Sequence, residues 1–403
     1  MAVLKGKNIV LGVTGSIAAY KSAEIVRELV TGGAHTRVVM TESARQFIGP
    51  QTLATLSGQK VLTRMFGDGT DPEIDHIRVP EKADAILIAP ATANIIAKMA
   101  SGIADDMLST MMLVARCPIL VAPAMNSNMY THPATEENVE KLKNRGIKII
   151  EPDIGELACG YTGPGRLALP SDIIEELRAA LTVPDMKGLR VLVTAGPTRE
   201  AIDPVRYISN RSSGKMGYAV ARAAIRHGAE VTVVGGPTGV AAPRKAALIS
   251  VETAEEMEAA CEEAFEETDV LVMAAAVADY RPQKVAGTKI KKTGNGMSVK
   301  LAPCPDILKG LSESASPRQV MVGFAAETDD VLINAKKKID KKKLDLLVAN
   351  KVNTPDSGFD HDTNRIRILD SKGGVEPYPL MTKDEAAEII VNHILKCIES
   401  KRG

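Results

Sequence analysis

The sequence predicts an α/β protein built from two doubly wound parallel-sheet domains. Its 403 residues exceed the roughly 150 residues of an average domain. The chain also restarts halfway, because the basic lead-in, apolar run and glycine turn of residues 5–15 recur at residues 187–196. In both halves continuous apolar runs alternate with helical patterns, and such runs are typical of strands buried on both faces of a parallel sheet.

In the first half, the apolar runs predict strands near 8–13, 36–40, 85–89, 118–122 and 147–150, with helices between them. A last helix carries Ile173, Ile174 and Leu177, and Ser171 is its expected cap. The residues that follow, 182–186, form a short connection that contains a proline. We therefore expect one domain at 1–183 and a second at 187–403.

The second half repeats the pattern. Apolar runs predict strands near 190–194, 230–234, 269–273, 319–323 and 345–349. Amphipathic patterns predict helices near 214–227, 254–267, 330–343 and 382–399. Helices on both faces of a parallel sheet make a second doubly wound domain.

Composition excludes several classes of function. Lys plus Arg and Asp plus Glu both total 50, so no net charge draws the chain to nucleic acid or to an anionic membrane. Aromatic residues make up 3%, with no Trp to stack on bases. No apolar run approaches the ~20 residues of a membrane span, and the run 9–13 is too short for a signal peptide. Five scattered cysteines show no zinc spacing, so we expect reduced thiols and a cytoplasmic enzyme.

In doubly wound sheets ligands bind beyond the carboxyl ends of the strands. In the first half the loops at these positions are small and polar, at 14–16, 41–43, 90–94 and 123–126. The turn Gly15-Ser16, which we expect to open the helix of Ile25 and Leu29, offers backbone N–H groups to one phosphate. A dinucleotide is less expected, because the turn lacks the GxGxxG spacing. A simple tight connection is the alternative.

Three further residues of this half are candidates for chemistry. His76 titrates near neutral pH and can act as a base, although a lone His is more often structural. Asn126 follows a buried strand, where its amide can hold a carboxylate or simply form a turn. Cys159 lies in a glycine-rich stretch that is suited to a mobile lid, from which a thiol can deliver a proton.

These features occur together in a known family. Residues 15–21, His76, residues 123–129 and residues 158–160 stand in the order and spacing of the flavin-containing cysteine decarboxylases, and the first half resembles phosphopantothenoylcysteine decarboxylase along its length. The resemblance implies a flavodoxin-like flavoprotein domain with FMN, which oxidises the cysteinyl thiol, lets the carboxylate leave as carbon dioxide and then reduces the enethiolate.

The resemblance also implies residue roles. His76 would serve oxidation and decarboxylation, Asn126 would anchor the carboxylate, and Cys159 would supply the proton for the reduction. The expected FMN contacts are Gly15, Ser16, Ile17, Thr41, Ser43, Ala91, Thr92, Asn94 and Ser109. Tyr130 replaces the family's usual Trp, and Tyr161 and Leu169 replace common acidic residues of the lid.

In the second half, a polar loop at 195–217 follows the first strand, and long loops of this kind are usually functional. It is not a P-loop, because Ser209 and Met216 break the GxxxxGK[ST] pattern, but the helix that follows can still bind phosphate. Lys338 and Lys342 stand four residues apart on one helical face. They can meet a nucleotide triphosphate, or they belong to a solvated helix face.

The second half resembles phosphopantothenate-cysteine ligase, and the two halves in this order resemble the bifunctional decarboxylase/ligase family of coenzyme A biosynthesis. The resemblance implies a Rossmann-like domain in which Mg²⁺ and CTP convert 4'-phosphopantothenate into an acyl-cytidylate that cysteine attacks. Lys289 would stabilise phosphate charge and Asn210 the acyl oxygen, with Asp203 and Arg206 also binding substrate. The expected CTP contacts are Ala274, Ala275, Asp279, Lys289, Pro305, Asp306, Ile307, Leu308, Phe324, Lys338 and Lys342. No metal ligand is assigned, because Mg²⁺ usually rides on the triphosphate.

Two other functions fit the fold class. An NAD(P)-dependent dehydrogenase with a nucleotide-binding second domain requires the GxGxxG turn, which neither half has. A regulatory or scaffold protein would have lost catalytic side chains that this chain retains. The family resemblance further implies decarboxylase trimers and ligase dimers, which together close into a dodecamer.

Overall fold

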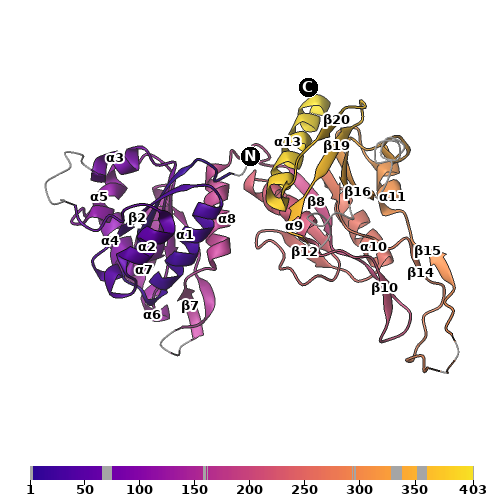
Figure 1. Cartoon of the computed structure of the whole chain (residues 1–403), viewed down its shortest axis with the longest axis horizontal. Coiled ribbons are helices and arrows are strands. Elements are labelled where there is room, and N and C mark those ends of the chain that lie inside the picture. Colours follow the sequence, from indigo (N-terminus) through magenta and orange to yellow (C-terminus); the bar gives the residue numbers. More distant parts are fainter. Residues whose placement is uncertain are drawn as a thin grey trace. The chain divides into compact units, whose positions relative to one another are not determined.

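A computed structural model describes residues 3–65, 75–157, 160, 162–292, 294, 296–327, 338–351 and 361–402, with only the backbone described at 326, 327 and 351. The chain divides into two compact units, Ala2–Val183 and Pro184–Gly403. Each unit has its own central sheet with helices packed on it, which confirms the predicted fold class (Figure 1).

The N-terminal unit has a five-stranded parallel sheet in the order β2-β1-β3-β4-β5. The strands are β1 (Asn8–Val13), β2 (His35–Met40), β3 (Ala85–Ala91), β4 (Ile119–Pro123) and β5 (Lys148–Ile149). They confirm the five strands predicted from the apolar runs. The order reverses between β1 and β3, and doubly wound sheets bind ligands at the carboxyl edge beside such a reversal.

Alternate strand residues of this sheet pack on opposite faces. Ile9, Leu11 and Leu87 pack with α1, α2 and α8, whereas Ile86 and Ile88 pack with α4, α5 and α7. The helices are η1 (Ile17–Lys21), α1 (Ser22–Thr31), η2 (Ser43–Gln46), α2 (Pro50–Ser57), α3 (Asp75–Glu81), α4 (Ala93–Ser101), α5 (Met107–Val114), α6 (Ser127–Tyr130), α7 (Pro133–Asn144) and α8 (Pro170–Leu181). A hairpin of β6 (Asp153–Glu156) and β7 (Thr162–Arg166) precedes α8.

Two local predictions in this unit were wrong. The turn Gly15-Ser16 opens the short 3₁₀ helix η1 rather than α1, whose N-cap is Lys21. Helix α8 begins at Pro170 with Leu169 as N-cap, so Ser171 lies inside the first turn. Proline is favoured at this first helical position because its fixed φ suits the helix and it has no N–H that needs a cap.

The C-terminal unit has an eight-stranded sheet in the order β12-β11-β8-β13-β16-β17-β19-β20. The first six strands are parallel: β8 (Arg190–Ala195), β11 (Glu230–Gly235), β12 (Ala247–Ser250), β13 (Val270–Met273), β16 (Val320–Glu327) and β17 (Leu346–Lys351). Their order is the 3-2-1-4-5-6 of Rossmann-like sheets. The antiparallel strands β19 (Ile366–Asp370) and β20 (Val375–Pro377), which were not among the predicted strands, extend one edge of this sheet.

Short antiparallel ribbons surround the carboxyl edge of this sheet. The predicted loop 195–217 contains one of them, the pair β9 (Arg199–Ala201) and β10 (Tyr207–Ser209). The other two pair β14 (Tyr280–Pro282) with β15 (Leu301–Pro303), and β18 (Thr363–Asn364) with β21 (Met381–Thr382). The helices are α9 (Lys215–Arg226), α10 (Ala254–Phe265), α11 (Ile307–Ser314) and α13 (Lys383–Arg402), while residues 338–342 are helical and 328–337 lie outside the described residues.

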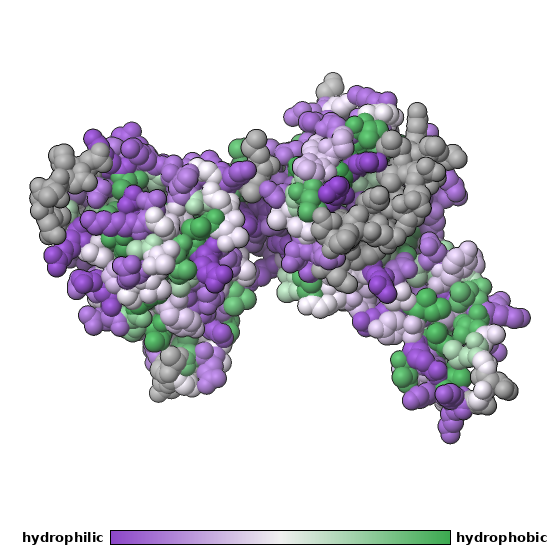
Figure 2. Space-filling model, in the orientation of Figure 1, coloured by the Kyte–Doolittle hydropathy of each residue, from purple (hydrophilic) through white to green (hydrophobic). Residues whose placement is uncertain are grey.

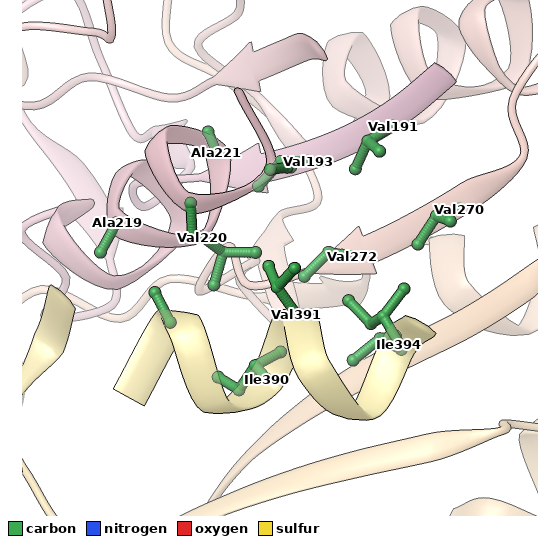
Figure 3. Close-up of a cluster of buried hydrophobic side chains, with 14 of the residues drawn as sticks. Val191, Val193, Ala219, Val220, Ala221, Val270, Val272, Ile390, Val391 and Ile394 are labelled. Atoms are coloured by element: carbon green, nitrogen blue, oxygen red, sulfur yellow. The ribbon is translucent and has the colours of Figure 1, made fainter. Parts of the chain in front are cut away.

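Helices α9 and α13 cover one face of this sheet. Figure 3 shows Val391 and Ile394 of α13 close to Val272 of β13, with Val220 of α9 beside them. Helices α10 and α11 pack on the opposite face, against residues such as Leu271. Each large aliphatic side chain buried in this way stabilises the fold by about 1.5–3 kcal/mol.

A buried charge cluster connects α9, α13 and the start of the C-terminal unit. His227 contacts Asp185 through Nδ1 (2.6 Å) and Glu388 through Nε2 (3.0 Å), and Arg226 donates to the same Glu388 carboxylate at 2.7 Å. Burial alone would lower the pKa of His227, but the hydrogen bonds to Glu388 and Asp185 raise it above its ordinary value. The folded state therefore holds the imidazolium more tightly than the unfolded chain does.

This cluster predicts a pH-dependent stability. A raised folded-state pKa contributes its full stabilisation below the unfolded value of about 6.5 and loses it as the pH rises through the folded value. The unfolding temperature of the C-terminal unit should therefore fall as the pH rises from about 6.5 through the raised pKa of His227, and His227→Gln should remove the part of the fall that comes from this residue. Thermal unfolding of both chains across that range measures the effect.

His393→Gln is the matched control, because burial lowers the pKa of His393 and its titration cannot produce the same fall. If the unfolding temperature of His227→Gln falls with pH as steeply as that of the wild type, the cluster is not the source of the fall.

Candidate active sites

In the N-terminal unit, Thr14 joins the loops that follow β1 and β3. Its buried hydroxyl donates to the carbonyl of Pro90 (2.8 Å) and accepts from the N–H of Thr92 (3.0 Å). These loops flank the point at which the strand order reverses. The two loops are therefore held together where doubly wound sheets bind ligands.

The loop after β2 packs against the loop after β1. A side chain at Gly15 would place its Cβ 2.4 Å from the Cβ of Ser43, so only glycine allows the two loops to touch. Ser16 caps η1 through Ala18, and the hydroxyl of Thr41 accepts from the N–H of Ala44 (3.3 Å). Within the part of the chain that the structure describes, the N–H groups of Gly15 and Ile17 bond to no protein acceptor.

The predicted contacts on α4 and α5 differ from one another. Ala91 is buried, Thr92 caps α4 through Ile95, and Asn94 is exposed in the first turn. Ser109, by contrast, is 2% exposed and forms a capping box with Asp106 at the start of α5. Its hydroxyl is thus engaged by its own helix.

Asn126 lies in a loop against which the β6–β7 hairpin packs. It caps α6, and its Oδ1 accepts from the N–H of Asn128 (2.8 Å). The hairpin packs on this loop so closely that a Cβ at Gly165 would approach the carbonyl of Met125 to 2.3 Å, and Gly165 adopts φ +128°. Cys159 and Tyr161, in the connection between β6 and β7, lie outside the described residues.

The departures from the family pattern have local consequences. The hydroxyl of Tyr130 donates to Glu151 (2.7 Å), and burial together with this carboxylate raises the pKa of Tyr130. Leu169 is 48% exposed at the start of α8.

A single chain does not bring His76 to Asn126. His76 is half-buried on α3, which packs against α5 and leads into the amino end of β3. Asn126 follows the carboxyl end of β4, and Figure 1 shows α3 at one end of this unit with α6 and β7 at the other. Within one copy, α3 with His76 and the loop with Asn126 therefore lie at opposite ends of the unit.

In the C-terminal unit the strand order reverses between β8 and β13, and threonine hydroxyls again join the loops that follow these two strands. The hydroxyl of Thr194 accepts from the N–H of Ala275 (3.1 Å), and that of Thr198 from the N–H of Ala278 (3.0 Å). Asn210 donates its amide to the carbonyls of Val277 (2.8 Å) and Ala276 (3.4 Å). Residues 274–279 are thus held from the β8 side by side chains.

A cleft of about 1230 Å³ opens at this edge. Asn210 and all the predicted nucleotide contacts except Lys289 line it: Ala274, Ala275, Asp279, Pro305, Asp306, Ile307, Leu308, Phe324, Lys338 and Lys342. Lys342 donates to Asp306 at 2.7 Å. Although burial would raise the pKa of Asp306, this lysine lowers it overall, so the carboxyl stays ionised near neutral pH.

Asp203 and Arg206 do not line the cleft. The carboxylate of Asp203 is buried and accepts from the Arg206 guanidinium (2.5 Å) and from the N–H of Ile290 (3.1 Å). Burial would raise the pKa of Asp203, but these hydrogen bonds hold it well below its usual range. The pair fastens the segment that carries exposed Lys289 to the β9–β10 ribbon.

This segment belongs to an arm, defined here as residues 280–303, that projects from the unit (Figure 1). Hydrophobic residues gather on it in Figure 2. The exposed apolar residues of the arm and the neighbouring ribbon are Val205, Tyr207, Tyr280, Val285, Met297 and Leu301.

The sequence did not indicate several residues that line the cleft. They include Lys215, Cys304, Asn350, Asn364 and Lys383. The Gly214-Lys215 pair was the available signal for one of them. Asn364 and Lys383 come from the β18–β21 ribbon and the start of α13, far along the chain, and no motif marks them.

No group of three or more His, Cys, Asp or Glu side chains is arranged to hold a metal ion in the part of the chain that the structure describes. None of the helices described is both long and apolar enough to cross a bilayer.

Comparison with known proteins identifies two family matches. The flavoprotein family matches residues 2–182, and the C-terminal domain family of DNA/pantothenate metabolism flavoproteins matches residues 186–398. The coenzyme A biosynthesis bifunctional protein CoaBC of Vibrio vulnificus is 43% identical over 100% of both chains, and that of Bacillus subtilis is 44% identical over 96% of this chain and 97% of its own. A crystal structure of a CoaBC C-terminal domain is 40% identical, covers 54% of this chain and 99% of its own, and superposes with a TM-score of 0.47.

Proposed function

We propose how two reactions are divided over this chain, which belongs to the family of coenzyme A biosynthesis bifunctional proteins. The chain is an enzyme with phosphopantothenate-cysteine ligase and phosphopantothenoylcysteine decarboxylase activities. The dehydrogenase alternative has no support. In our proposal the ligase unit acts first, and the flavoprotein unit then decarboxylates its product in the cytoplasm.

The flavoprotein unit is proposed to bind FMN at the reversal point between β1 and β3. Two observations support this: the 2-1-3-4-5 strand order that places FMN at this point in flavodoxin-like sheets, and the N–H groups of Gly15 and Ile17 with the hydroxyls of Thr41, Ser43 and Thr92 around it. Hydroxyl and backbone N–H donors suit a phosphate and a ribityl chain. Bound there, the flavin would supply reversible two-electron transfer.

The chain's own residues are proposed to manage the carboxylate and the protons. Asn126 holds the substrate carboxylate at the carboxyl edge, below the hairpin. Cys159, in the connection of that hairpin, donates the proton needed for the final reduction. His76 completes the site from a second copy of the chain, because α3 and α6 lie at opposite ends of one copy (Figure 1).

A trimer of flavoprotein units would supply this second copy. Exposed apolar residues of the unit, among them Ile17, Tyr20, Leu113 and Ile154, offer surface for such self-association. Closed symmetry is the common form of homo-oligomers.

The ligase unit is proposed to bind CTP, with Mg²⁺ on its triphosphate, in the 1230 Å³ cleft. The observation that carries this proposal is that residues predicted from four separate motifs line one cavity. Lys338 and Lys342 would meet phosphate charge, and Phe324 offers an apolar surface to the base. The substrate carboxylate would displace pyrophosphate to give an acyl-cytidylate, and the cysteine amine would then displace CMP.

The arm is proposed to carry Lys289 into the cleft of a second ligase unit. Lys289 is exposed and does not line the cleft of its own chain. A dimer that buries the apolar residues of the arm would bring it to the partner's cleft. Ligase dimers and flavoprotein trimers together would form the dodecamer.

The mass of the product tests the proposal. Purified chain with 4'-phosphopantothenate, cysteine, Mg²⁺ and CTP should yield phosphopantetheine, with CMP and pyrophosphate released in equal amounts. Omission of CTP should stop all product. Product formed equally well with ATP would contradict the CTP proposal, and accumulation of phosphopantothenoylcysteine would contradict a working flavin site.

A further inference from the structure

A second cavity lies in the ligase unit, at the carboxyl ends of β11 and β12. Its volume is about 590 Å³, within the range of roughly 300–1,000 Å³ that is usual for small-molecule sites. It is distinct from the 1230 Å³ cleft, called the ligase cleft here, because no described residue lines both. The apolar part of its wall is formed by Pro237, Val240, Ala242, Leu248 and Val251.

Two side chains of opposite charge, Arg199 and Glu252, line this cavity without pairing with each other. The N–H of Arg199 donates to the carbonyl of Glu252 at 2.7 Å, so their backbones are in direct contact. The Arg199 guanidinium instead lies over the ring of Tyr207, 4.7 Å from its centre. Among the described residues, neither this guanidinium nor the Glu252 carboxylate has an ion-pair partner. A ligand that carries both charges would satisfy the two groups together.

The cavity also receives a buried hydroxyl. Tyr218, near the start of α9, lines the cavity although it is only 3% exposed, and its hydroxyl lies beside Gly235 at the end of β11. Within the part of the chain that the structure describes, this hydroxyl makes no hydrogen bond. Burial raises the pKa of Tyr218, so the hydroxyl keeps its proton and can donate it to an acceptor. Because a buried polar group without a partner is costly, a ligand oxygen would stabilise it.

We propose that this cavity binds a free α-amino acid, with the carboxylate at Arg199 and Tyr218 and the ammonium group at Glu252. An α-amino acid carries both charges on one carbon atom, which suits two opposite charges on neighbouring backbones. The apolar wall suits an aliphatic or thiol side chain. The ligand is either cysteine, which the ligase reaction consumes, or an aliphatic amino acid such as valine.

The cavity adjoins the ligase cleft. Thr238, which lines the cavity, donates to the carbonyl of Ser213, which lines the cleft, at 2.7 Å. A Cβ at Gly236 would lie 1.8 Å from the carbonyl oxygen of Pro197, so only glycine allows these two loops to pack so closely. An amino acid in the cavity would therefore bind one loop away from the ligase site.

Isothermal titration of the full chain with L-valine and, separately, L-cysteine tests the proposal. CTP is left out, so ligation cannot consume the cysteine. At least one of the two should bind with one site per chain. The same molecule without its ammonium group or without its carboxylate should bind at least about tenfold more weakly, because one charged contact is lost. These analogues are isovalerate and isobutylamine for valine, and mercaptopropionate and cysteamine for cysteine.

Three variants place the bound amino acid in this cavity. Arg199→Met and Glu252→Gln should each weaken binding by about ten- to a hundredfold, and Tyr218→Phe by about two- to tenfold, since it removes a neutral donor. Tyr218→Phe keeps the buried ring, so its unfolding temperature should not fall below that of the wild type. Glu267→Gln removes an exposed carboxylate that pairs with Arg190 at the amino end of β8, and it should bind like the wild type.

The outcomes separate the two sources of the ligand. Binding of cysteine alone assigns the cavity to the substrate of the ligase, whereas binding of valine assigns it to aliphatic amino acids. The proposal is overturned if the wild type binds neither, or if binding is undiminished in all three folded variants. Because the titration contains no CTP, failure of the CTP proposal leaves this test unaffected.

Discussion

Replacing His76 by asparagine should reduce carbon dioxide release by a factor on the order of 10² to 10⁴, because a positioned acid or base contributes this much to rate. Ligation should be unchanged, since His76 lies in the other compact unit. The measurement is release of labelled carbon dioxide from phosphopantothenoylcysteine, with CMP formation followed in parallel. Both activities come from one purified chain, so each serves as an internal standard for the other.

His132→Asn is the matched control. His132 caps α7 in the same unit by accepting from the N–H of Ala134, and asparagine is also a good cap. This variant should therefore release carbon dioxide at the wild-type rate. Wild-type release by His76→Asn would instead return His76 to a structural role on α3.

The assembly proposal makes the same variant informative in a second way. If His76 and Asn126 of one site come from different copies, then co-expressed His76→Asn and Asn126→Ala chains form some sites with both side chains intact. Random mixing in equal amounts would restore about a quarter of the wild-type rate, although each variant alone is inactive. No recovery in verified mixed oligomers would mean that each site draws both residues from one chain.

The central strands of both sheets were predictable because their residues are apolar on both faces. A run such as Ala85–Ala89 leaves no polar face for solvent, and only a sheet covered by helices satisfies it. The antiparallel strands β19 and β20 were missed, although Ile366, Arg367 and Ile368 alternate and Gly373-Gly374 marks a hairpin. A short alternating pattern is a weaker signal for a strand than the continuous apolar runs of the parallel strands.

The lining of the ligase cleft was predictable wherever a loop directly follows a strand of the parallel sheet. Helical spacing suggested Lys338 and Lys342, and family resemblance added residues 305–308; the structure brings all of these to the same cleft. Asn364 and Lys383 were not predictable, because they reach the cleft through the β18–β21 pairing and the packing of α13 on α9. Contacts between segments distant in sequence leave no local pattern.

Asp203 illustrates a residue that sequence reasoning placed in a binding site but whose contacts are within the protein. Its place in a polar loop near Asn210 suggested substrate binding, yet its carboxylate is enclosed by Arg206 and the N–H of Ile290. A charged residue in a functional loop can equally well hold that loop together. Residue type and position alone do not separate these two roles.

Asn210→Asp should lower ligation by about 100-fold or more, and the step that slows will identify the role of the side chain. If the amide of Asn210 stabilises the acyl oxygen, cysteine attack slows most and acyl-cytidylate accumulates. The structure also gives this amide a positioning role, because it donates to the carbonyls of Val277 and Ala276. A carboxylate there would face two carbonyl oxygens without a donor and would loosen residues 274–279.

Rapid quench with 4'-phosphopantothenate and CTP, without cysteine, separates the two roles. Trapped acyl-cytidylate at the wild-type rate, with slow capture by cysteine, supports the acyl-oxygen role. Slow formation of acyl-cytidylate, together with a raised KM for CTP, supports the positioning role, because the loosened loop carries Ala274, Ala275 and Asp279, which line the cleft and are proposed to contact CTP. Asn392→Asp adds the same charge on an exposed turn of α13 and should leave both steps unchanged; wild-type kinetics in Asn210→Asp would exclude both roles.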